Sequence, residues 1–261
     1  MERTSESRFE KDLSEETTWE KAAKTRMGKY LTGIETSFVA DSIAGSRPRM
    51  IMDVGAGAGK FSLLEEENNG TVVSIDIDVY GLKRLKLQND KVHIIQADAK
   101  NIPLRNEVFE AIFMVEVLDY ISEAEKVFEE CYRTLKHDGL FVFSFGNKSS
   151  IKQKLRKLRG KSYTHAYDRI MNWLSATGFS VKRKIGFNWG LFGRTSENRL
   201  VPLFAGIEKI LGLRRLPSFS PWVMLHAIKS EKNYEEQNST FFKSNNKIAL
   251  QEATIINHKN K

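Results

Sequence analysis

The stretch Met50–Lys60, MIMDVGAGAGK, decides the fold of this 261-residue chain. Three apolar residues lead to Asp53, and glycines then occupy alternate positions at Gly55, Gly57 and Gly59. Alternating glycines allow a tight turn between a strand and a helix, and they let a ligand approach the main chain closely. The carboxylate before the glycines would repel a pyrophosphate and attract a cation. The stretch therefore predicts a strand, a ligand-binding turn and a helix whose free N–H groups point toward the ligand.

A second strand follows at the distance expected for one strand–helix–strand unit. The run Thr71–Asp78 is rich in β-branched residues and ends in acid, and Asp76 lies 23 residues after Asp53. A carboxylate at the carboxyl end of this strand can accept hydrogen bonds from both hydroxyls of a ribose. The alternative is that Asp76 and Asp78 only end the strand and cap the next helix, which we expect more for Asp78.

The glycine turn and two later strands resemble those of the class I S-adenosylmethionine-dependent methyltransferases. D-V-G-A-G-A-G at 53–59 is similar to the family's (D/E)-x-G-x-G-x-G motif, and Val92–Ala99 resembles its third strand, whose acid, here Asp98, takes the adenine amino group. Leu135–Ser144 resembles its L-K-P-G-G turn and fifth strand, with His137-Asp138 replacing Pro-Gly. The resemblance implies S-adenosyl-L-methionine as the cofactor, bound by Asp53, Gly55, Gly57, Gly59, Asp76, Ile77, Asp98, Ala99 and Glu116.

The chemistry that this resemblance implies needs few catalytic groups. Methyl transfer from a sulfonium is a direct displacement, so alignment and exclusion of water are the protein's main tasks. A general base is needed only when the acceptor must lose a proton. We expect His165 as that base by residue type and region, and Glu116 or Asp119 by position after the fourth strand. A structural role is the alternative for His165. The sequence has no cluster with metal-ligand spacing, so no metal is expected.

The order of strands and helices predicts the fold class. They alternate from Met50 to Phe145, which indicates a parallel sheet with helices on both faces. The resemblance implies a Rossmann-like, doubly wound α/β sheet of seven mostly parallel strands. Its last strand, expected at Trp222–Ile228, should run antiparallel between the fifth strand and the sixth, expected at Phe179–Gly186.

Local signals predict the helices around the sheet. Apolar residues at helical spacing from 16 to 44 indicate leading helices with a break at Met27-Gly28. Tyr30 in this region is a candidate to close the pocket, and plain packing on the sheet is the alternative. The helix at Ser122–Leu135 is expected to begin with a capping box formed by Ser122 and Glu125.

We expect three parts in the chain: a tail with leading helices at 1–45, a methyltransferase domain at 46–229, and a polar, disordered tail at 230–261. Within the domain, 148–161 carries seven basic residues and no acid, and it can form a basic helix that is either solvated or on the acceptor or membrane side. The connection 187–221 is several times longer than a hairpin needs. Its apolar part predicts either a lid helix or a helix lying at a membrane interface.

Composition bounds the partners. The formal net charge of +8 and the pI near 9.4 suggest an anionic partner, and they leave nucleic acid, a phospholipid surface and a phosphorylated small molecule open. The single cysteine, Cys131, excludes an internal disulfide, and neither a signal peptide nor a membrane-spanning apolar run is evident. We therefore expect a cytoplasmic protein, with peripheral contact at the inner membrane face as an option.

Three functions fit these features. The first is a methyltransferase for a small-molecule or lipid-linked acceptor, such as a polyprenyl or saccharide intermediate, favoured by the basic segment and the apolar connection. The second is an RNA or protein methyltransferase; Glu116–Asp119 lacks the (N/D/S)-P-P-(Y/F/W) motif and no RNA-binding module is recognisable, so nucleic acid is not expected as a partner. The third is a non-catalytic S-adenosylmethionine-binding protein, against which the three acids of the motifs argue. The oligomeric state is open.

Overall fold

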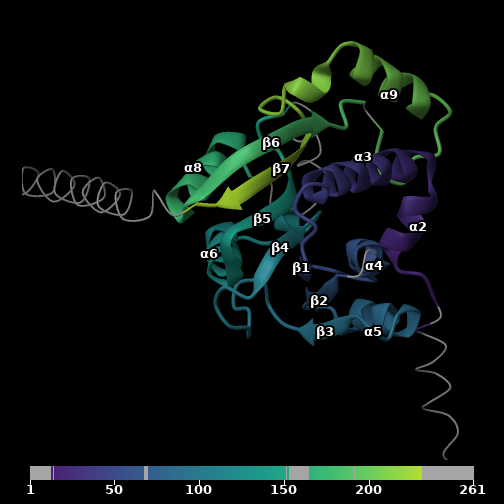
Figure 1. Cartoon of the computed structure of the whole chain (residues 1–261). Helices are drawn as coiled ribbons and strands as arrows, with labels where there is room; N and C mark the ends of the chain where they lie inside the picture. Colours follow the sequence, from purple (N-terminus) through teal and green to yellow (C-terminus); the bar gives the residue numbers. More distant parts are fainter. Residues whose placement is uncertain are drawn as a thin grey trace, which may run out of the picture.

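The computed structural model describes residues 13, 15–67, 70–150, 152, 165–190 and 192–230 (Figure 1). Of the basic segment 148–161, residues 148–150 and 152 are described, whereas 151 and 153–161 lie outside the described residues, as does the tail 231–261. In chain order the elements are α2 (Thr18–Lys24), α3 (Arg26–Ile43), β1 (Met50–Val54), α4 (Lys60–Glu67), β2 (Thr71–Asp76), α5 (Val79–Gln88), β3 (His93–Gln96), β4 (Phe109–Met114), η1 (Leu118–Tyr120), α6 (Ala124–Thr134), β5 (Leu135–Gly146), α8 (Tyr167–Thr177), β6 (Phe179–Phe187), α9 (Val201–Ile210), η3 (Leu213–Arg215) and β7 (Trp222–Lys229).

The strands form one seven-stranded sheet in the order β3-β2-β1-β4-β5-β7-β6. β1 lies between β2 and β4 and pairs with both in parallel. From β1 the chain adds β2 and β3 on one side of the sheet, and it then crosses to add β4 and the later strands on the other side. β7 pairs antiparallel with β5 and with β6. The expected Rossmann-like, doubly wound sheet with an antiparallel last strand is therefore confirmed.

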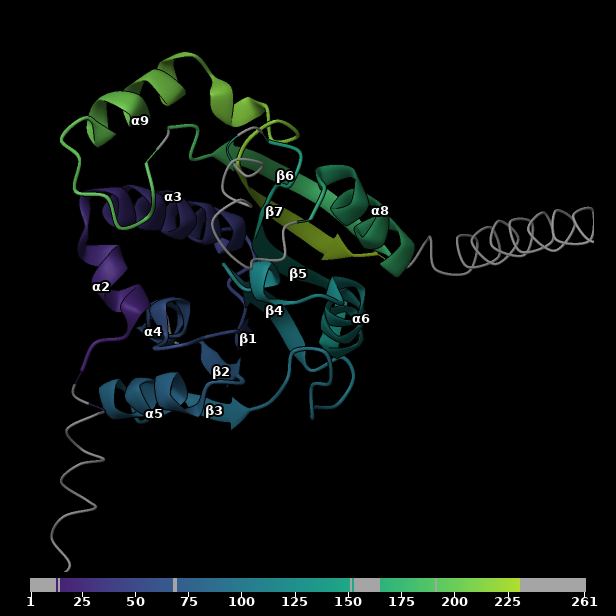
Figure 2. The same ribbon diagram turned by 180° about the vertical axis from the view of Figure 1, so that it is seen from behind.

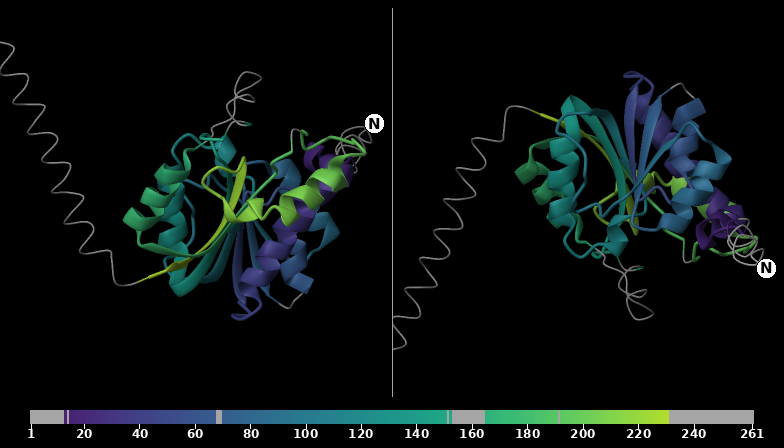
Figure 3. Two further views of the ribbon diagram at one scale, coloured as in Figure 1. Left: turned by 90° about the horizontal axis from the view of Figure 1, so that it is seen from above. Right: turned by 90° about the horizontal axis from the view of Figure 1, so that it is seen from below.

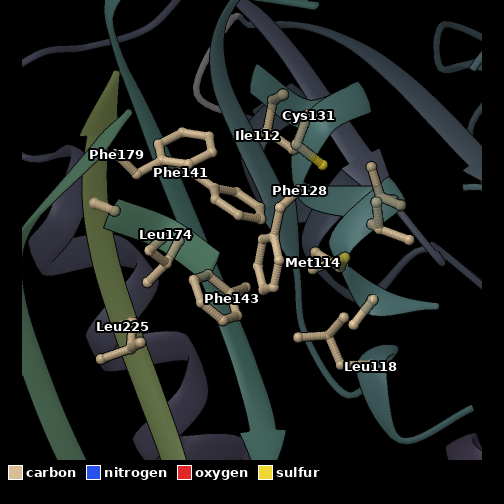
Figure 4. Close-up of a cluster of buried hydrophobic side chains, with 14 of the residues drawn as sticks. Ile112, Met114, Leu118, Phe128, Cys131, Phe141, Phe143, Leu174, Phe179 and Leu225 are labelled. Atoms are coloured by element: carbon tan, nitrogen blue, oxygen red, sulfur yellow. The ribbon is translucent and has the colours of Figure 1, made fainter. Parts of the chain in front are cut away.

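Helices cover both faces of the sheet, as the view along the sheet shows (Figure 3). On one face, α6 and α8 pack on β4 and β5 around an aromatic core (Figure 4). The Phe128 ring of α6 meets the rings of Phe141 and Phe143 edge to face, with centroids 6.1 and 5.3 Å apart. On the other face, α3, α4 and α5 contribute Phe38, Phe61 and other apolar side chains to a second core. Burial of both faces explains the nearly continuous apolar runs of the central strands.

The leading helical region divides at Thr25, two residues before the expected break at Met27-Gly28. Thr25 is extended, and its hydroxyl accepts a hydrogen bond from the Gly28 amide, which begins α3. Gly28 is required there because a Cβ would lie 1.8 Å from the Ala22 carbonyl oxygen. The close approach of α2 and α3 therefore uses the glycine, while the threonine makes the break.

The capping box expected at Ser122 is wrong. α6 begins at Ala124, with Glu123 at the N-cap and no side-chain hydrogen bond to the helix. The Glu123 carboxylate instead pairs with Lys126 and, at 3.3 Å, with Lys100. The helix thus starts one residue later than the predicted cap requires, and its N-cap side chain makes one local ion pair and one to the loop after β3.

The long connection between β6 and β7 contains α9 and η3. Figures 1 and 2 show α9 alongside α3, on the outer side of the molecule. No helix in the described part of the chain is both long and apolar enough to cross a membrane.

Candidate functional site

A cavity of about 960 Å³ lies beyond the carboxyl ends of β1, β2 and β4. In a doubly wound sheet this is the switch point, where loops from neighbouring strands diverge and leave room for a ligand. The glycine turn forms its floor, α2 and the start of α3 lie on one side, and the segments after β3 and β4 form the opposite wall. Eight of the nine residues predicted to bind a cofactor line this cavity: Asp53, Gly55, Gly57, Asp76, Ile77, Asp98, Ala99 and Glu116. The ninth, Gly59, does not line it and packs against Leu85.

The three glycines of the turn have positive φ, and they serve two different purposes. A Cβ at Gly55 would lie 2.2 Å from the Val117 side chain, and one at Gly59 would lie 2.2 Å from the Leu85 side chain. At these two positions, therefore, neighbouring side chains leave no room for a side chain larger than hydrogen. A Cβ at Gly57 would meet no atom within 4 Å. Gly57 therefore leaves its backbone open to the cavity, as close approach of a ligand requires.

Asp53 lies at the end of β1 beneath the turn and is almost fully buried. Its carboxylate accepts hydrogen bonds from the Ser62 amide at 3.1 Å and the Ser62 hydroxyl at 2.6 Å. Burial raises the pKa of Asp53 to about 7, although the Ser62 hydrogen bonds act in the opposite direction. The motif acid thus combines a structural contact to α4 with a position in the wall of the cavity.

Asp76, at the end of β2, links the two strands that carry the site. One carboxylate oxygen accepts from the Gly57 amide at 2.8 Å and the other from the Asp78 amide at 2.8 Å. Asp78 caps α5, because its side chain accepts from the Tyr80 amide at 3.0 Å, as the sequence favoured. Between them, Ile77 is 70% exposed and faces the cavity. Asp76 therefore holds the glycine turn while keeping further lone pairs for a ligand.

The segment after β3 adds a third acid. The Asp98 carboxylate accepts from the Lys100 amide at 2.9 Å, and its other oxygen lies 3.6 Å from the Lys100 ammonium. Asp98, Ala99 and Lys100 all line the cavity. This wall therefore presents a partly neutralised carboxylate beside exposed backbone.

Four charged side chains form a network beside the turn. Glu116 pairs with Arg194, Arg194 lies 3.5 Å from Glu35, and Glu35 pairs with Lys60. Glu35 is fully buried. The pKa values of Lys60 and Arg194 are lowered, because the effect of burial outweighs the opposing attraction of Glu35. Glu116 has a φ of +64°, and its amide donates to the Ser144 hydroxyl at 2.7 Å. Two acids and two bases therefore compensate one another where the cavity meets α3 and the long connection.

Arg194 is held over the cavity by residues of α2 and α3. Its guanidinium lies 5.0 Å from the centre of the Trp19 ring, and its carbonyl accepts from the Thr25 hydroxyl at 2.9 Å. Trp19 also meets Tyr120 edge to face, with centroids 6.3 Å apart. These aromatic rings are partly exposed and line the cavity, so they form its rim.

The other two candidate bases lie away from the cavity. The His165 ring is buried against Trp173, with ring centroids 5.6 Å apart, and its Nε2 lies 3.3 Å from the Leu118 carbonyl. The buried Asp119 carboxylate accepts from the Gly146 amide at 2.8 Å. Neither residue lines the cavity. Of the three predicted catalytic residues, the fold brings only Glu116 to the wall.

Tyr30 does not close the cavity. Its hydroxyl donates to Glu208 at 2.5 Å, which directs the ring toward α9. The rim residues that do cover the cavity, Trp19 and Arg194, were not found from sequence. They come from segments 175 residues apart, and no local motif marks either one. Within the described residues, no group of three His, Cys, Asp or Glu side chains could hold a metal ion.

Sequence comparison with known proteins identifies methyltransferases as relatives. A family model described as a methyltransferase domain matches residues 52–143. The chain is 28% identical over 154 residues to malonyl-acyl-carrier protein O-methyltransferase of Geobacter sulfurreducens, covering 52% of this chain and 57% of that protein. It is 25% identical over 170 residues to ubiquinone biosynthesis O-methyltransferase of Pseudomonas entomophila, covering 57% of this chain and 70% of that protein. The matches span only about half the length of the malonyl-acyl-carrier protein relatives.

The fold is similar to that of solved methyltransferases. The crystal structure of magnesium protoporphyrin IX methyltransferase from Synechocystis PCC 6803 with bound S-adenosylhomocysteine superposes with a TM-score of 0.59 at 16% identity, covering 87% of this chain and 95% of that one. The sheet order, the glycine turn and the matched segment 52–143 are all consistent with a methyltransferase domain. Residues 52–143 therefore match a methyltransferase domain, and sequence and fold together support a class I S-adenosylmethionine-dependent methyltransferase.

Proposed function

We propose that the chain is an enzyme that transfers a methyl group from S-adenosylmethionine to a small-molecule acceptor. One observation carries the proposal: the open backbone at Gly57 faces a cavity that is bordered by the carboxylates of Asp53, Asp76 and Asp98. These acids come from the ends of three neighbouring strands or the loops after them, so the sheet holds them around one space.

The cavity walls fit the separate parts of this cofactor. Asp76 has lone pairs left for ribose hydroxyls beyond its bonds to the Gly57 and Asp78 amides. Ile77 and Ile121 offer apolar surface to an adenine ring near Asp98. The acid Asp53 favours a cationic ligand over a phosphate. When bound, the cofactor supplies an electrophilic methyl group on a sulfonium.

We place the acceptor at the rim formed by Trp19, Tyr120 and the Glu116–Arg194 pair. These groups would orient the acceptor and exclude water from the reacting atoms. If the acceptor must lose a proton, Glu116 is the base that the geometry favours, because His165 and Asp119 lie outside the cavity.

The relatives' names mention malonyl-acyl-carrier protein, sterols and ubiquinone biosynthesis, which supports an organic acceptor with apolar parts. We propose a lipid-linked acceptor as the finer assignment, with residues 46–229 as the catalytic domain. Such an acceptor requires access to a membrane surface, for which the exposed apolar residues of α9 are suited.

Calorimetric titration with S-adenosylmethionine tests the proposal. We expect saturable binding by the wild type and loss of binding in Asp76→Ala. Asp90→Ala, an exposed acid outside the cavity, serves as the matched control and should bind normally. Transfer of a radiolabelled methyl group to a panel of lipid-linked and free acceptors then tests turnover. Failure of the folded wild type to bind S-adenosylmethionine would contradict the proposal.

A further inference from the structure

The helix α9 is inverted relative to a normal surface helix. Its apolar residues Leu203, Ile207 and Ile210 recur at spacings of four and three, yet they are 57%, 39% and 84% exposed. The charged residue Glu208 is instead buried on the protein side. A helix that packs only on its own domain normally buries its apolar stripe and exposes its charges. Among the described residues, no other part of the protein covers the apolar outer face of α9.

Polar contacts hold α9 in this orientation. The buried Glu208 carboxylate accepts from the Tyr30 hydroxyl at 2.5 Å, the Trp189 amide at 3.2 Å and the Arg214 guanidinium at 3.1 Å. A rotation that buried the apolar stripe would break all three contacts and expose the acid to solvent on the other side. The inverted orientation is thus specified by the fold and is not an incidental packing of a short helix.

The apolar face continues at both ends of the helix. Leu200 precedes α9 and Leu211 follows it, and both are exposed. With Leu203, Ile207 and Ile210 they form what we call the α9 face. A group of neighbouring, exposed, large apolar side chains is typical of an interaction site.

The exposed charged side chains within residues 198–220 have one sign, and the acid just before this range, Glu197, lies 3.8 Å from Arg26. Arg199, Lys209 and Arg215 are exposed, and the only acid between residues 198 and 220 is Glu208, which is buried and paired. The chain as a whole carries a net charge of +8. Exposed apolar residues flanked along the chain by exposed bases are complementary to a bilayer with anionic headgroups, into which a helix of this length inserts lying flat.

We propose that the α9 face docks this protein on an anionic membrane surface. Leu203, Ile207 and Ile210 enter the boundary between headgroups and acyl chains, while Arg199, Lys209 and Arg215 meet the lipid phosphates. The connection that begins at β6 carries both the α9 face and Arg194, so docking holds the rim of the cavity close to the lipid. Docking itself requires no methyl transfer, so it can succeed or fail independently of the proposed function.

Vesicle co-sedimentation of the full chain tests this proposal. We expect binding to vesicles of phosphatidylcholine mixed with phosphatidylglycerol, much weaker binding to phosphatidylcholine alone, and a loss of binding at high salt. The double variant Leu203→Glu/Ile210→Glu should bind at least about tenfold more weakly, because it places two charges in the interface. Leu87→Glu, at a residue that is 71% exposed on α5, is the matched control and should bind like the wild type.

Each other outcome overturns the proposal. Equal binding by the wild type and the α9 double variant would assign the membrane contact to another basic part of the chain, such as 148–161. Absence of vesicle binding, together with a dimer in solution that the double variant makes monomeric, would identify a second copy of the chain as the occupant. Circular dichroism of the double variant establishes that it is folded, which is expected because both side chains are already exposed.

Discussion

Arg194 and Glu116 are 78 residues apart in the chain, and their side chains pair in the wall of the cavity. Glu116 follows β4, at the switch point of the sheet, whereas Arg194 belongs to the connection between β6 and β7. Arg194 also reaches Glu35 and Trp19. One side chain thus ties the leading helices, the central sheet and the long connection together above the proposed cofactor site.

The first prediction concerns this pair. Arg194→Met should lower the free energy of unfolding by about 2 kcal/mol, because it leaves the buried Glu35 and the mostly buried Glu116 with less compensating charge. Urea denaturation measures the effect. Arg199→Met, at an exposed arginine of the same connection, should change stability by less than about 0.5 kcal/mol. Equal stability of the two variants would show that the network contributes nothing.

The glycine turn allows a test that separates packing from ligand binding. Gly59→Ala should destabilise the protein by about 2 to 3 kcal/mol, because its Cβ would lie 2.2 Å from Leu85 and its φ is +87°. Gly57→Ala should cost only about 1 kcal/mol, since its Cβ meets open space, but it should weaken S-adenosylmethionine binding at least about tenfold. Thermal unfolding and calorimetry measure the two quantities. Unchanged binding by Gly57→Ala would place the ligand away from the turn.

Asp53 should make the stability of the ligand-free protein depend on pH. Burial raises its pKa from 3.8 to about 7, so the folded state holds the proton more tightly than the unfolded state does between these values. Stability should therefore fall as the pH rises through this range, by up to about 4 kcal/mol from this group. Asp53→Asn keeps the acceptor for Ser62 and removes the charge.

The measurement is the difference in unfolding free energy between the wild type and Asp53→Asn at pH 5 and at pH 8. Other titrating groups cancel in this difference. We expect the wild type to lose stability relative to the variant as the pH rises. Parallel curves would mean that the carboxyl of Asp53 titrates near its ordinary pKa.

Glu208 provides a prediction about the orientation of α9. Glu208→Gln should lower the free energy of unfolding by about 2 kcal/mol. The carboxylate accepts hydrogen bonds from three donors, and the amide NH₂ of glutamine, itself a donor, would face at least one of them. Limited proteolysis within 192–221 should become faster. Glu129→Gln, on an exposed position of α6, is the matched control. Protection equal to that of the wild type would show that α9 is held by other contacts.

Local sequence patterns predicted well where they act over a few residues. The glycine turn, the strands that flank it and the cap formed by Asp78 each depend on neighbours in the chain, and the structure has them at the expected places. The box at Ser122 was wrong because α6 begins at Ala124, which puts Glu123 and not Ser122 at the N-cap position. The division of the leading helices was displaced to Thr25 because a threonine cap ended α2 before the glycine.

The sequence by itself determined the sheet and the part of the cavity formed by the glycine turn and the acids at the strand ends, since backbone conformation at glycines and the position of acids at strand ends follow from local chemistry and a regular repeat. Only the tertiary structure decided which charged groups meet there. Arg194, Glu35 and Trp19 come from three distant segments and have no local motif, and the outward face of α9 depends on which way a buried glutamate turns the helix. Such choices are settled by long-range electrostatics and packing, because burying a charge is tolerated only where the folded chain brings it a partner.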